Sequence, residues 1–108
     1  MACRPTTWDA VGSGSFSVDA STAKTLDSTT ASGDNITTVQ DTNKKRVWRV
    51  WITASGAIRF TFDGTAPTSS TWHQLASGAS LDLDVSPRKF KFISESGTVT
   101  VYASYFGE

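Results

Sequence analysis

His73 is the first residue to test for chemistry, because it is the only histidine in the chain. A serine hydrolase needs a histidine beside a carboxylate and a nucleophilic serine, which many such enzymes raise on a tight G-x-S-x-G turn. No serine of this sequence stands in that setting, so we interpret His73 as an ordinary strand residue. A zinc site needs several His or Cys ligands, and the single Cys3 cannot complete one.

The carboxylates give a similar answer. Asp82 and Asp84 are two residues apart on one expected strand face, a spacing that could suit an acid and a base. The next strand offers them Lys89 and Lys91 if the Ser86-Pro87 turn closes a hairpin, so we expect solvated ion pairs. The remaining aspartates match no calcium-binding loop. We therefore predict no catalytic, cofactor-binding or metal-binding residues and expect a protein that is not an enzyme.

Charge and hydropathy argue against two further classes of partner. The formal net charge is zero, and the basic run Lys44-Lys45-Arg46 has no basic stripe to continue it, so we expect no nucleic-acid partner. No apolar run approaches the roughly 20 residues that cross a bilayer, so we expect no membrane partner. The first ten residues lack the apolar segment of a secretion signal, which favours synthesis in the cytosol.

The elements that would position any site are organised around residues 47–64, VWRVWITASGAIRFTFDG. Two runs rich in Val, Ile, Trp and Phe flank a short Ala-Ser-Gly connection, which predicts a β-hairpin. The second run alternates, with Ile58 and Phe60 on one face and Arg59 on the other. The first run is apolar on both faces, with Trp51 on one and Val50 on the other. Such a strand is central in a sandwich or lies under a neighbouring subunit.

Short strands then follow at a steady spacing, bounded by Gly, Pro, Ser and Asp turns. We expect them at residues 71–75, 81–85, 90–93 and 99–103. Short connections make neighbouring strands antiparallel, and helix content should be close to nil. The sequence therefore predicts an all-β fold, an antiparallel β-sandwich that is jelly-roll-like or a small barrel.

Residues 1–45 differ from the sandwich core predicted at residues 46–108. They are polar and rich in small residues, a composition that alone tends to stay disordered because it buries little apolar surface. Weak strand signals occur at Phe16 and Val18 and at residues 36–39. We predict an extended N-terminal arm that either adds edge strands to its own sheet or is held by a partner, and we favour the partner.

Aromatic and apolar side chains outside the expected core are candidates for contact with other molecules. Our predicted interface residues are Trp8, Phe16, Val18, Trp48, Tyr102, Tyr105 and Phe106. Exposed tryptophans can also stack on sugar rings, so a carbohydrate-binding module that uses Trp8 and Trp72 is an alternative of a different class. Sugar sites usually add amide and charged groups, whereas only His73 and Gln74 lie beside Trp72 in the sequence.

The run from Trp51 to Phe106 resembles small structural proteins of tailed bacteriophages. The resemblance is carried by the DGTAPTSS turn after a strand, the LASG break, and the KFKFIS and SGTVTV strands near the end of the chain. It covers roughly half of the chain, and the N-terminal arm has no counterpart in it.

The resemblance implies an accessory virion protein, which decorates or cements the capsid by binding coat subunits. An alternative within the same class is a neck, tail or fibre-base protein. The implied partners are the major capsid protein or other virion proteins, together with further copies of this chain in a homo-oligomer such as a trimer. The implied location is the virion, after synthesis in the host cytoplasm.

Overall fold

A computed structural model describes residues 9–83 and 89–108 of the chain, which form two antiparallel sheets. The first sheet has five strands in the order β3-β1-β9-β4-β7, and the second has four in the order β2-β8-β5-β6. The five are β1 (Asp9–Val18), β3 (Ser32–Gly33), β4 (Val47–Ala54), β7 (Ser80–Leu83) and β9 (Val99–Gly107). The four are β2 (Lys24–Thr25), β5 (Ile58–Thr61), β6 (His73–Leu75) and β8 (Lys91–Ser94). The predicted all-β antiparallel sandwich is confirmed.

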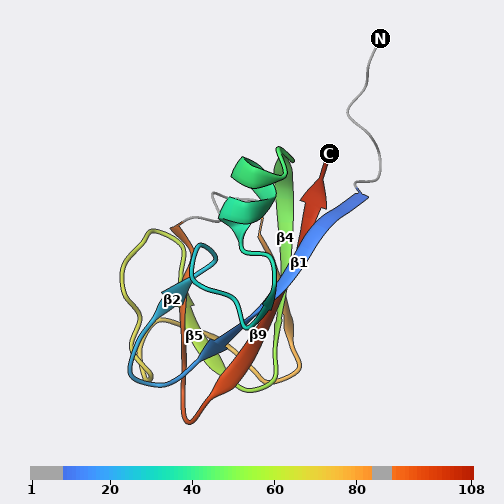
Figure 1. Cartoon of the computed structure of the whole chain (residues 1–108). Helices are drawn as coiled ribbons and strands as arrows, with labels where there is room; N and C mark the ends of the chain where they lie inside the picture. The colour runs from blue at the N-terminus through green and yellow to red at the C-terminus, as the bar shows by residue number, and fades with distance from the viewer. Residues whose placement is uncertain (1–8, 84–88) are drawn as a thin grey trace.

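β9 is the centre of the five-stranded sheet and pairs with β1 on one side and β4 on the other, so the three strands run side by side (Figure 1). Its sequence alternates as the pattern predicts: Val101, Ala103 and Tyr105 are buried. Tyr102 lies between them on the opposite face and is exposed. The strand extends beyond the predicted residue 103 to Gly107, which places the aromatic residues near the chain end within the sheet.

The predicted hairpin at residues 47–64 is wrong, although both of its strands form. β4 pairs with β7 and β9, whereas β5 pairs with β6 and β8, so the connection between them crosses from one sheet to the other. Ser55 N donates to Thr100 O and Glu95 N donates to Ala57 O, which ties the crossing to strands of both sheets. Because the chain folds over in this way, the apolar faces of β4 and β5 meet across the core instead of lying in one layer.

The expected hairpin between β7 and β8 is also wrong. β7 is the edge of the five-stranded sheet and β8 pairs with β5 and β2 in the other, so these two strands do not pair. Asp82 instead faces β4, where Arg49 is its partner. Asp84 and the Ser86-Pro87 turn, which were also part of the expected hairpin, lie outside the described residues.

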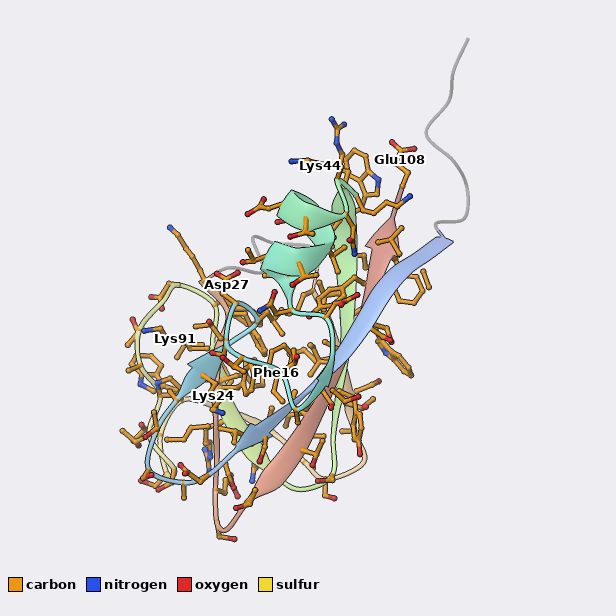
Figure 2. The ribbon with its side chains drawn as sticks, viewed as in Figure 1. Phe16, Lys24, Asp27, Lys44, Lys91 and Glu108 are labelled. Carbon is orange, nitrogen blue, oxygen red and sulfur yellow. The ribbon has the colours of Figure 1, made fainter. Side chains whose placement is uncertain are left out.

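Residues 9–45 are part of the sandwich, which corrects the division into an arm at 1–45 and a core at 46–108. β1 pairs with β9 from Asp9 to Val18, an interior position instead of the expected edge. Phe16 lies at the centre of the molecule (Figure 2). The segment contributes five fully or almost fully buried side chains to the core: Phe16, Val18, Leu26, Ile36 and Val39. The described part of the segment is therefore held by its own subunit, contrary to the partner that we favoured.

Residues 36 and 37 are helical and lead into η1 (Thr38–Thr42), although the strand signal at residues 36–39 predicts an extended segment. Asn35 organises the turn, because its Oδ1 accepts from Thr38 N at 2.8 Å while its Nδ2 donates to Ser28 O at 3.3 Å. The turn directs Ile36 and Val39 into the core, both with no exposed surface. A local side-chain hydrogen bond thus competes successfully with the strand pattern.

If residues 9–45 are integral to the fold, truncating Phe16 must be costly. We expect Phe16→Ala to lower the free energy of unfolding by about 3–5 kcal/mol, because it opens a cavity beside Phe92, with which Phe16 makes an edge-on ring contact at 5.8 Å. Ser17→Ala, one residue away on the exposed face, should change it by less than about 0.5 kcal/mol. Urea titrations followed by circular dichroism measure both values. Equal stability of the two variants would mean that this segment does not belong to the core.

Candidate functional site

The outer face of the five-stranded sheet carries a row of aromatic side chains that we call the outer aromatic stripe: Tyr102, Trp51 and Phe106. Register places it there, because Tyr102 pairs with Thr53, Trp51 with Ser104, and Phe106 with Arg49. Each aromatic residue is thus a diagonal neighbour of the next across β9 and β4, a separation within reach of large side chains. Tyr102 is 52% exposed and Trp51 46% exposed, whereas Phe106 is partly buried.

Small residues surround the stripe on the β1 side. A groove of about 350 Å³ runs beside Tyr102. Its lining consists of Ser13, Gly14, Ser15, Ser32, Gly33, Tyr102, Ala103 and Ser104. The small side chains follow from close backbone packing, because a Cβ atom at Gly14 would approach Asp34 O to 2.1 Å. None of the described residues that line the groove is charged, so together they offer aromatic surface and hydroxyl groups.

A bidentate ion pair lies on the other side of the stripe. Arg49 Nε is 2.8 Å from Asp82 Oδ1 and Arg49 Nη2 is 2.5 Å from Asp82 Oδ2, and Asp82 stands opposite Trp51 in the register. The hydrogen bonds from Arg49, more than its charge, hold the pKa of Asp82 below its usual value. Both side chains are about half exposed, so the pair adds little stability and mainly fixes the local geometry.

A second exposed aromatic residue, Trp72, lies just before β6 in the other sheet and is 54% exposed. Its main chain has φ of 77°, in the left-handed region that non-glycine residues rarely adopt. Arg59 Nη1 donates to Trp72 O at 3.1 Å, and Arg59 Nε pairs with Glu95 Oε2 at 2.6 Å. Gln74 Nε2 donates to the same Glu95 oxygen at 2.7 Å. We call Arg59, Gln74 and Glu95 the Arg59 network.

Three of the predicted interface residues are core residues, which is a correction. Phe16 and Val18 point between the sheets from β1, and Tyr105 has no exposed surface. The Tyr105 hydroxyl donates to Asp34 O at 3.2 Å, and burial raises the pKa of this phenol. Strand alternation separates Tyr105 from Tyr102, because residues an odd number apart face opposite sides of a sheet.

The other predicted residues have mixed outcomes. Tyr102 and Phe106 lie on the outer face, as described, and Trp8 lies outside the described residues. Trp48 is half-buried in β4, at the irregularity in its pairing with β9, and the Arg46 guanidinium is 5.3 Å from its ring centre. Its Nε1 is the one buried side-chain polar atom of the described residues without a hydrogen-bond partner.

Sequence reasoning missed two features. Trp51 is not among the predicted site residues, because its strand is apolar on both faces and only the burial of Val50 and Ile52 in the structure shows that Trp51 faces outward. The Arg59 network had no sequence signal, because Arg59 and Glu95 are far apart in the chain and meet only through the pairing of β5 with β8 and β6.

His73 belongs to an aromatic cluster of the four-stranded sheet. It packs against aromatic rings, with its ring centre 5.5 Å from that of Phe60 and 5.9 Å from that of Phe62.

Within 9–83 and 89–108, no group of three or more His, Cys, Asp or Glu side chains gathers as a metal site would require, and no helix is long and apolar enough to span a membrane. No family model, curated protein or solved structure matches the chain.

The buried phenol makes stability depend on alkaline pH. The folded-state pKa of Tyr105 is raised above its ordinary value of 10.0. Its contribution to the free energy of unfolding is therefore complete below pH 10 and is lost at higher pH, where the phenol ionises in the unfolded chain. We expect Tyr105→Phe to cost about 1 kcal/mol at pH 8, since the hydrogen bond to Asp34 O is lost. The difference in free energy of unfolding between Tyr105→Phe and the native chain should then shrink between about pH 10 and pH 11.5.

Urea titrations at several pH values measure this gap. Tyr102→Phe is the matched control: its side chain is exposed, so its difference from the native chain should stay constant over the same range. A constant gap for Tyr105→Phe as well would contradict a buried phenol at this position.

Proposed function

We propose that this chain is a non-enzymatic structural protein of a tailed-phage virion, made in the host cytoplasm, which decorates or cements the capsid by docking onto coat subunits. The observation that carries the proposal is the outer aromatic stripe of Tyr102, Trp51 and Phe106, two of whose members are about half exposed. The phage-like run from Trp51 to Phe106 supports the virion as the setting.

The stripe has the properties of a docking surface. Exposed Trp and Tyr side chains supply much of the binding energy of protein interfaces when a partner removes them from water. Here they stand on β9 and β4, interior strands of the five-stranded sheet, so binding need not order a flexible segment first. The neighbouring serines and glycines leave room for a partner to approach the rings closely.

This mechanism replaces the ordered arm that we expected from the sequence. Residues 9–45 are already folded into the sandwich, where β1 pairs with β9 and β2 pairs with β8, so adhesion is assigned to the sheet face. A neck, tail or fibre-base position is the alternative setting. It would use the same face, and the partner would be a different virion protein.

Docking can be tested by cosedimentation with coat-protein shells assembled without this protein. The double variant Trp51→Ala Tyr102→Ser should bind at least about a hundredfold more weakly, because interface aromatics of this kind each contribute about 2 kcal/mol or more when truncated. Trp72→Ala is the matched control, since it removes an equally exposed indole from the other sheet. Unchanged binding of the double variant, or equal loss in the control, would refute docking through the stripe.

The oligomeric state can be measured separately. We propose a homo-oligomer and expect native mass spectrometry to show a trimer. A strict monomer at high protein concentration would contradict it. If the double variant Trp51→Ala Tyr102→Ser converts the trimer to a monomer, the stripe joins copies of this chain and does not contact the coat.

A further inference from the structure

Trp72 combines features that rarely occur together in a residue without a function. Its side chain is 54% exposed, so it contributes little to the core. Its φ of 77° is a strained conformation for a side chain of this size. The fold thus maintains an unfavourable backbone geometry to present an indole to solvent.

The Arg59 network holds Trp72 in that conformation. Arg59 donates from Nη1 to the Trp72 carbonyl and from Nε to Glu95, which also accepts from Gln74. The Arg59 and Glu95 side chains are only about one quarter exposed, so their contact is better protected from water than a surface pair. The main chain at Trp72 is therefore fixed by a rigid polar cluster from β5, β6 and the turn after β8.

We propose that Trp72 and the Arg59 network form a binding site for a neutral saccharide. An indole presents a flat apolar surface for the C–H face of a sugar ring. Arg59 Nη2 and Glu95 Oε1 make no hydrogen bond within the described residues, so a donor and an acceptor remain for adjacent sugar hydroxyls. The amide of Gln74 adds a further acceptor. Gln74 is already beside Trp72 in the sequence, whereas Arg59 and Glu95 are charged groups that only the fold brings to it.

Charge selects the class of saccharide. The guanidinium of Arg59 is already paired with the carboxylate of Glu95, so the cluster carries no net charge. A phosphate or a strongly acidic polymer would have to compete with Glu95 for Arg59, whereas hydroxyl groups can bond to the outer atoms of both. A neutral sugar is thus the ligand that leaves the network intact.

The proposed saccharide site lies on a different sheet from the outer aromatic stripe, so both surfaces can be occupied at once. Trp72 and the Arg59 network belong to the four-stranded sheet, and the outer aromatic stripe belongs to the five-stranded sheet. The two sheets pack face to face, so a partner docked on one outer surface leaves the other free. The saccharide site therefore does not rest on the proposed virion function and is tested on the isolated protein.

Affinity electrophoresis provides the test, with gels that contain dextran, glucomannan, galactan or the neutral O-polysaccharide released from a bacterial lipopolysaccharide. We expect at least one polymer to retard the native chain. Trp72→Ala should weaken the retardation at least about tenfold, whereas Trp72→Phe, which keeps an aromatic surface, should retain most of it. Ser17→Ala, exposed on β1 of the opposite sheet and outside the outer aromatic stripe, should behave like the native chain.

A further variant separates binding from folding. Trp72→Gly removes the indole and also relieves the strained φ, so its melting temperature should equal or exceed that of the native chain while retardation is lost. Absence of retardation of the native chain by all four polymers would overturn the proposal. Retardation of Trp72→Ala or Trp72→Gly equal to that of the native chain would overturn it as well.

Discussion

The pairing of β9 with β1 and β4 is the constraint on which the rest of the structure depends. β9 has hydrogen-bonded neighbours on both sides along nearly its whole length, and its inward side chains fill the middle of the core. Because successive residues of a strand alternate between faces, burial of Val101, Ala103 and Tyr105 leaves Tyr102 with no position except the outside. The exposed aromatic surface is thus a direct consequence of how the core is filled.

Alternation let the sequence predict where most strands lie and which of their faces is buried, but not which strands pair. β4 and β5 have strongly apolar inward faces, and a short connection between two such strands fits a hairpin and a crossing between sheets equally well. The N-terminal segment was misjudged from its composition. Its few apolar residues are too sparse to predict a core from composition, yet Phe16 and Leu26 are fully buried because long-range pairing with β9 and β8 positions them.

The two candidate surfaces differ in how far the sequence could have revealed them. Alternation alone places Trp51 on the opposite face of its strand from Val50 and Ile52, but because both faces are apolar it does not tell which face is outward. The contact of Arg59 with Glu95 depends on which strands neighbour β5, and a local pattern contains no such information. The left-handed backbone at Trp72 is similarly a product of tertiary contacts, since no residue preference favours tryptophan there.

The pairing of β1 with β9 brings together the first and last strands of the described residues, so this part of the fold depends on the order of synthesis. The five-stranded sheet cannot form while β9 is still inside the ribosome. Until then β1 and β4 lack the strand that pairs with both of them. Contacts between such distant segments also give the fold a high contact order, which slows folding. The polar, serine-rich composition of the early segment suits this delay, because an unpaired strand with little apolar surface is less prone to aggregate.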